Sequence, residues 1–118
     1  MNTSIDTTLL DGLIVGRVDP HIYAFSTGTI PNYLKVGDTY RPVNVRLDEW
    51  RVHFNDLVPL YEHIAKVDNG NIFRDYSVHY FLEHDKHLRR LEQGTFEIEY
   101  YSKEFFEGAT TNDVDDAI

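Results

Sequence analysis

Four residues of the kinds found in catalytic sites lie close together in residues 21–50. They are Tyr23, Lys35, Gly37 and Arg46. Basic residues also recur on this segment and again in residues 86–90, and such clusters can bind the phosphates of a nucleic acid. A solvated surface explains the same clusters equally well. The charge pattern alone therefore leaves phosphate binding as one of two interpretations.

Acidic and histidine residues recur in the second half of the chain. Asp75 precedes His79 by four positions, which places both on one face of a helix. His79, Glu83 and His87 continue at the same spacing, and His84 with His87 adds another pair, a pattern compatible with zinc. No cysteine supports a zinc site. The alternative interpretations are that Asp75 favours the helix dipole and that His79 packs beside it or relays a proton.

Each residue of the first group also has an ordinary structural interpretation. Tyr23 could be a half-buried strand tyrosine, and Lys35 a strand lysine that faces solvent. Arg46 lies beside Asp48 and Glu49 and could form a surface ion pair of little energetic value. Each structural interpretation is plausible for its residue alone. The arrangement of the strands and helices must therefore decide between the structural and the catalytic interpretation.

The sequence predicts a small α+β domain, with a three-stranded antiparallel sheet flanked by helices. Alternating apolar residues predict the strands, glycine, proline and asparagine predict the turns, and Pro42 suits the first turn of a helix. The expected elements are strand 21–26, turn 27–32, strand 33–39, helix 43–54, strand 57–67, turn 68–71, helix 73–93 ending at Gly94, edge strand 95–101 and a helical turn at 102–108. For 57–67 a helix is the competing interpretation, because the apolar run is short.

The order of these motifs resembles the GIY-YIG endonuclease superfamily. His21-Ile22-Tyr23 matches its first motif, and Lys35-Val36-Gly37 matches the second motif of a divergent branch in phage and restriction-type helicase proteins, where a lysine replaces the usual tyrosine. Arg46 matches the helix arginine of the family. In the same branch an acidic residue precedes a histidine by four positions on a later helix, as Asp75 precedes His79. The resemblance covers about residues 20–106 and ends on the acidic-Phe-Phe signature of Glu104-Phe105-Phe106.

The resemblance implies a metal-dependent nuclease that hydrolyses DNA phosphodiesters. It assigns one Mg2+ or Mn2+ ligand to Asp75, where the family usually has a glutamate. Arg46 would neutralise charge on the phosphoryl oxygens, and Tyr23 would accept or relay the proton of the attacking water, with Lys35 as a nearby cation. His79 is a candidate proton relay. Gly37 is assigned a structural role, because it lets another group approach the backbone closely.

The chain as a whole limits the other expectations. Its 118 residues make one domain, which we divide into an N-terminal segment 1–19, the nuclease-like part 20–106 and an acidic tail or linker 107–118. The formal net charge is −9, but residues 13–106 hold 14 acidic and 11 basic residues, so the excess lies mainly in the ends. Neither a signal peptide nor an apolar span is evident, which predicts a cytoplasmic protein without a membrane partner.

The weakly acidic interior predicts poor DNA affinity in isolation. We therefore expect binding to come from a fused or associated helicase or DNA-binding domain. The alternative function is a catalytically inactive nucleic-acid- or protein-binding module with the same fold. A third is a small inhibitor domain whose acidic surface imitates DNA.

Overall fold

The computed structural model describes residues 19–118, and the N-terminal segment 1–18 lies outside the described residues. The elements are β1 (His21–Ser26), β2 (Tyr33–Thr39), α2 (Val43–Trp50), β3 (Val58–Ile64), α3 (Asp75–His84), β4 (Phe105–Glu107) and α4 (Thr111–Ala117). The strands form one antiparallel sheet in the order β3-β1-β2-β4. The α+β class is confirmed, and the expectation of three strands is wrong, because a fourth strand pairs with β2. No helix of residues 19–118 has both the length and the apolar character needed to cross a bilayer.

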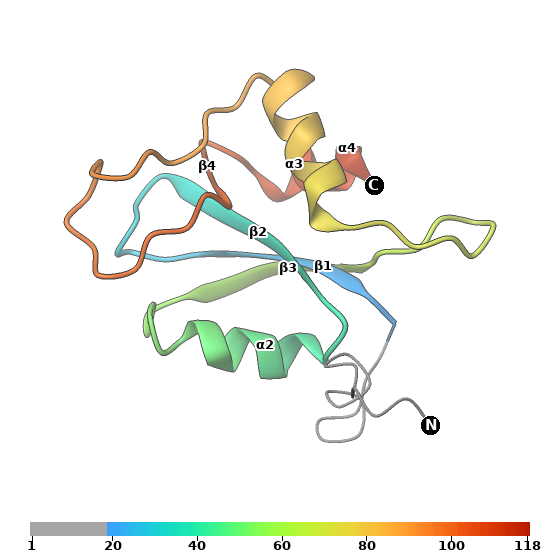
Figure 1. The fold of residues 1–118 in the computed structure, drawn as a ribbon, viewed down its shortest axis with the longest axis horizontal. Helices are drawn as coiled ribbons and strands as arrows, with labels where there is room; N and C mark the ends of the chain where they lie inside the picture. Colours follow the sequence, from blue (N-terminus) through green and yellow to red (C-terminus); the bar gives the residue numbers. More distant parts are fainter. Residues whose placement is uncertain (1–18) are drawn as a thin grey trace, which may run out of the picture.

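Alternation along the hairpin separates the core into two layers. α2 covers one face of the sheet, whereas α3 and α4 cover the other (Figure 1). Tyr23 and Phe25 point to the α2 side and pack with Trp50, while Ile22 and Ala24 point to the α3 side. Each layer therefore takes every second residue of β1, as the period of a strand requires.

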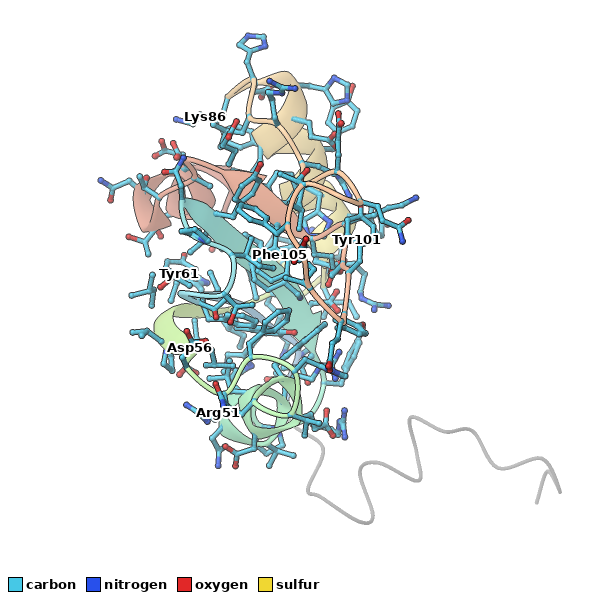
Figure 2. All side chains as sticks on the ribbon, turned by 90° about the vertical axis from the view of Figure 1, so that its left-hand side faces the viewer. Arg51, Asp56, Tyr61, Lys86, Tyr101 and Phe105 are labelled. Atoms are coloured by element: carbon cyan, nitrogen blue, oxygen red, sulfur yellow. The ribbon has the colours of Figure 1, made fainter. Side chains whose placement is uncertain are left out.

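The predicted helical turn at 102–108 is wrong, because the chain forms β4 there. Phe105 and Phe106 are both fully buried and belong to opposite layers of the core. Adjacent side chains reach opposite faces only in a strand. Figure 2 shows Phe105 at the centre of the molecule, between the helical layers.

The predicted edge strand 95–101 is also absent. Phe96, Ile98 and Tyr101 are partly buried against the α2 layer, whereas the residues between them are exposed. The alternation of apolar and polar residues, which predicted a strand, instead reflects a loop that packs its apolar side chains against the core. This segment forms no strand pairing, so it belongs to an irregular connection.

The helix predicted over 73–93 ends at His84 in the structure. The chain turns at His87, whose φ of 57° is left-handed, and the Leu88 N–H donates to the Leu82 carbonyl. Beyond this turn, Arg90 forms a β-bridge with Phe106. The residues after 84 are thus used to cover the outer edge of β4 rather than to extend α3.

The acidic tail or linker predicted at 107–118 contains α4, which packs against α3. Thr110 and Asp113 form a reciprocal capping box, and Val114 is fully buried. Its acidic residues have partners, since the Asp115 carboxylate accepts a hydrogen bond from Tyr61 and Lys86 lies 2.7 Å from Asp116. Capping and one buried valine give order to a sequence whose composition indicates disorder.

Candidate functional site

The β1–β2 hairpin brings Tyr23, Lys35 and Gly37 together on the α2 side of the sheet. Tyr23 pairs with Gly37 across the strands, and Phe25 pairs with Lys35. A Cβ atom at position 37 would lie 2.7 Å from Tyr23 Oη and 2.8 Å from Lys35 Nζ, closer than such contacts allow. Position 37 must therefore be glycine for these two side chains to meet above it. The groups that approach the Gly37 backbone closely are the side-chain ends of Tyr23 and Lys35.

Lys35 does not face solvent as an ordinary strand lysine would. Its side chain is 0% exposed, and Nζ lies 2.6 Å from Glu104 Oε1. Nζ also lies 4.3 Å from the centre of the Trp50 ring and 5.2 Å from that of Tyr23. A fully buried lysine is rare unless it is paired, and here a carboxylate and two aromatic faces compensate it.

β4 is short and begins only at Phe105, so it leaves the edge of β2 beyond Lys35 without a strand partner. The helix α3 reaches β2 at this edge. β4 pairs with β2 only as far as Lys35. At the next residue, the Val36 N–H donates to the Glu104 carbonyl, and the Val36 carbonyl accepts a 2.7 Å hydrogen bond from His79 Nε2. Polar groups from both layers of the core can therefore meet at this edge.

Asp38 anchors the start of α3 to the same edge. Its carboxylate accepts hydrogen bonds from the Asp75 N–H, at 2.9 Å, and from Arg74 Nε, at 2.6 Å. These bonds satisfy the helix end from outside the helix, since Arg74 as N-cap makes no side-chain cap. Asp75 is thereby held at the point where α3 meets β2.

Asp75, His79 and Glu104 form a cluster with the composition of a metal site. One ligand atom from each lies within 4.8 Å of the other two. Among residues 19–118 this is the one group of three or more acidic, histidine or cysteine side chains arranged in this way. We name it the edge cluster. It joins the predicted metal ligand Asp75 to His79, which was predicted as catalytic, and adds Glu104.

The two carboxyl groups of the edge cluster have pKa values shifted in opposite directions. Burial raises the pKa of Asp75 to about 7, with further contributions from its hydrogen bond to Glu104 and from the charge of Asp38. Burial also acts to raise the pKa of Glu104, but the charge of Lys35 and hydrogen bonds from Asp75 and Lys35 hold it below its ordinary value. Near neutral pH, a proton therefore resides on Asp75, and Glu104 is ionised.

His79 is neutral and has a defined tautomer. Burial lowers the pKa of His79, and the charges of Arg90 and Lys35 act in the same direction. Because a carbonyl can only accept, the hydrogen bond to Val36 places the proton on Nε2. The lone pair on Nδ1 is then available to a ligand, and a ring held by a backbone carbonyl is typical of metal-binding histidines.

Arg46 lies beside Tyr23 on the α2 side of the site. Its guanidinium lies 4.9 Å from the centre of the Trp50 ring, and Nη1 lies 2.9 Å from Glu49 Oε1. Burial acts to lower the pKa of Arg46, but hydrogen bonds to Glu49 and Tyr23, with the charges of both, raise it overall. The surface ion pair with Glu49 therefore exists, and Arg46 contacts the predicted catalytic tyrosine as well.

The site residues differ in their exposure to solvent. Tyr23 and Lys35 are 1% and 0% exposed, whereas Arg46, Asp75 and Glu104 are each partly exposed. The two carboxylates and the guanidinium are thus the groups that an anionic substrate or a cation could reach from solvent. Tyr23 and Lys35 lie directly beneath them.

The alternative zinc pattern on α3 is not assembled. His87 lies beyond the end of the helix at His84, and His79 is buried. The His84 ring is tilted against Tyr80, with ring centres 4.1 Å apart, and Glu83 pairs with Arg90 at 2.8 Å. The i, i+4, i+8 spacing therefore does not bring these side chains to one point.

Sequence reasoning missed two members of the site. Glu104 is part of the terminal motif of the resemblance but has no predicted role, and its place in that motif is the signal that the sequence offers. Trp50 was read as part of the apolar face of α2. Its contacts with Tyr23, Lys35 and Arg46 depend on the packing of the helix, and the sequence gives no direct sign of them.

Comparison of the chain with protein-family models, with curated proteins and with solved structures found no match. The chemistry of the site consequently has to be argued from its own residues. A carboxylate pair with a neutral histidine can bind a divalent cation, and the Arg46 guanidinium, which contacts the same Trp50 ring as Lys35, can bind a phosphoryl oxygen.

Proposed function

We propose that this chain is a metal-dependent DNA endonuclease domain of the GIY-YIG type, part of or tethered to a larger restriction- or helicase-type protein. The observation that carries the proposal is the edge cluster of Asp75, His79 and Glu104, to which Lys35 and Trp50 connect Arg46 and Tyr23. Motif residues from distant sequence positions come together around one end of β2, and the partly exposed Arg46, Asp75 and Glu104 are the ones that a phosphodiester or its metal ion would contact. The proposed cofactor is Mg2+ or Mn2+, and the proposed substrate is DNA.

The donor set of the edge cluster fits such a cation. Two carboxylates supply hard oxygen ligands, and a cation would take the place of the proton that Asp75 holds near neutral pH. A histidine nitrogen favours Mn2+ over Mg2+, so we expect tighter binding of Mn2+. A bound divalent cation supplies Lewis-acid chemistry, which polarises the phosphate and stabilises the leaving oxygen.

The other residues act around that centre. Arg46 neutralises the charge that develops on the phosphoryl oxygens. Tyr23 accepts the proton of the attacking water or relays it, from its place beneath Arg46. Lys35 is fully buried, and its role is to hold Glu104 in position and to offset the negative charge of the edge cluster.

Plasmid cleavage tests the proposal. Purified protein with Mn2+ or Mg2+ is expected to nick supercoiled DNA, and Asp75→Asn and Glu104→Gln are each expected to lower the rate by at least about a hundredfold, the scale of losing one electrostatic contact to the transition state. The matched control is Asp116→Asn, an acidic residue of α4 that is paired with Lys86. Nicking by the Asp75→Asn variant at the wild-type rate, or no nicking by the wild type, would contradict the proposed nuclease activity.

A binding module is the second candidate, and two exposed tyrosines favour it. Tyr76 and Tyr80 are 69% and 63% exposed. They border a surface hollow of about 490 Å3 with Ser77, Glu83 and Arg90. Aromatic rings on a helix flank can stack on bases or pack on a protein partner. This function would be favoured by a wild-type protein that binds DNA without a divalent cation and does not cleave it. The Tyr80→Ser variant should then lose DNA binding.

A further inference from the structure

We infer that Trp50 is the positioning residue of this site, because it holds Tyr23, Lys35 and Arg46 in place. The inference rests on the proposed function, since it assigns Trp50 a role in phosphodiester cleavage. Trp50 is the last residue of α2, it is 5% exposed, and it has contacts with all three groups. Residues on two strands and one helix are thereby tied to a single side chain.

The indole N–H fixes the hydroxyl of Tyr23. Trp50 Nε1 lies 2.6 Å from Tyr23 Oη in a buried hydrogen bond. Because an indole nitrogen can only donate, the phenolic oxygen must be the acceptor. The oxygen therefore accepts from Trp50 and, because a guanidinium can also only donate, from Arg46, so the O–H hydrogen of Tyr23 must point away from both. This determines the directions from which the oxygen can give or receive a proton.

The face of the indole holds the two cations. Lys35 Nζ lies 4.3 Å from the centre of the ring, and the Arg46 guanidinium lies 4.9 Å from it. Both distances are within the range of cation–π attraction, which is strongest for tryptophan. The ring therefore keeps two positive charges beside the Tyr23 oxygen, despite their mutual repulsion.

Neighbouring rings keep the indole from turning. Phe54 is stacked on it at 6.2 Å, Phe25 is tilted against it at 6.1 Å, and Tyr100 meets it edge-on at 5.6 Å. A side chain confined on these sides has one rotamer, so its N–H points in one direction. Trp50 can thus position Tyr23 without contacting the substrate.

Replacing the indole N–H with sulfur tests this directly. Trp50 is the only tryptophan in the chain, so benzothienylalanine can replace it at one site and delete the donor while it keeps the ring. We expect kcat for DNA nicking to fall about tenfold with KM unchanged, which corresponds to about 1.4 kcal/mol in the transition state. Trp50→Leu also removes the cation contacts and should lose more. Tyr33→Phe, which changes an aromatic side chain that packs on Phe96, should keep kcat.

Fluorescence gives a second readout that does not depend on activity. Emission from this single tryptophan reports its hydrogen-bond partner, so Tyr23→Phe should shift the emission maximum, whereas Tyr33→Phe should not. Unchanged emission in Tyr23→Phe overturns the hydrogen bond. Wild-type kcat in the benzothienylalanine protein overturns the positioning role. A wild-type protein that cleaves no DNA overturns the proposed function itself, and with it the catalytic role of Trp50.

Discussion

Two of the lysine–carboxylate networks in residues 19–118 differ in burial. Lys35 meets Glu104 at 2.6 Å at the edge cluster, and Lys86 meets Asp116 at 2.7 Å between the end of α3 and α4. The contact distances are nearly the same. The Lys35 side chain, however, is 0% exposed, while that of Lys86 is 30% exposed and lies at the periphery of the molecule (Figure 2).

The two networks also differ in how their remaining acids are satisfied. In α4, Asp113 belongs to the capping box and Asp115 accepts a hydrogen bond from Tyr61. At the edge cluster, Asp75 forms no ion pair with another residue of 19–118, and its pKa is raised to about 7. A partly buried acid with a strongly raised pKa is a perturbed group of the kind that clusters at functional sites, and a cation that bound there would displace its proton. The comparison therefore separates a network whose acids all have partners from the one that we propose binds a cation.

Removing the lysines should show the largest difference between the networks. Lys35→Met leaves the Glu104 carboxylate half-buried beside Asp75 without its cation, and we expect the free energy of unfolding to fall by about 3 kcal/mol. Lys86→Met is the matched change in the exposed network and should alter chemical denaturation far less. Adding Glu104→Gln to Lys35→Met should recover part of the loss. Equal losses in the two single variants would contradict the distinction.

A methyl group at position 37 should disturb the Lys35 network and leave the Lys86 network unchanged. Gly37→Ala places a Cβ 2.7 Å from Tyr23 Oη and 2.8 Å from Lys35 Nζ, so both side chains must move. We expect a loss of about 2 kcal/mol in thermal or chemical unfolding, the usual cost of overpacking. Tyr23→Phe in the same protein should rescue part of the loss, since it removes the hydroxyl. A stable Gly37→Ala protein with wild-type tryptophan emission would refute this geometry.

The protonation of Asp75 predicts a pH dependence. Its folded pKa is raised to about 7, so its contribution to stability is fully present below the pKa of the unfolded chain and is lost as the pH rises through about 7. His79 has a lowered pKa and acts in the opposite direction, gaining stability as the pH rises through the pKa of the unfolded chain.

A comparison with Asp75→Asn cancels the effect of His79. Between about pH 5.5 and about pH 8.5, we expect the asparagine variant to gain roughly 1–2 kcal/mol relative to the wild type, a value reduced for the partial exposure of Asp75. Urea denaturation at both pH values measures it. A constant difference between the two proteins would mean that Asp75 is ionised throughout this range.

Loss of the α4 cap should have the smallest effect. Thr110→Ala removes the side chain that accepts from the Asp113 N–H, which should cost about 1 kcal/mol of stability. DNA nicking and metal binding should be unchanged, because α4 contributes no residue to the edge cluster. Thr110→Ser is the control that keeps the cap. A parallel loss of metal affinity in Thr110→Ala would connect the two networks.

The sequence predicted the local parts of this structure well. The hairpin, its turn, the start of α2 at Val43 after Pro42 and the strand at 58–64 follow from alternation and turn residues, which act over short distances. The second half was harder, because its pattern depends on tertiary contacts. Alternation at 95–101 came from packing on the core, and the Phe105-Phe106 pair formed a strand because the two faces of the sheet each required one ring.

The site was predicted in part for the same reason. Tyr23, Lys35 and Gly37 meet through the register of one hairpin, which the sequence specifies. The meeting of Asp75 and Glu104 depends on where β4 stops and on how Asp38 anchors α3, and both are long-range properties. The burial of Lys35 could not be predicted either, since it results from Trp50 and Glu104 closing over it.

Mn2+ binding tests the central claim most directly. Electron paramagnetic resonance of Mn2+ titrated with the wild-type protein at about pH 8, where Asp75 has released its proton, should show one ion bound per chain. Asp75→Asn and Glu104→Gln should each lose this binding, and Asp116→Asn, in the α4 network, should retain it. Absence of binding by the wild type, or equal binding by Asp75→Asn, would show that the edge cluster is not a metal site.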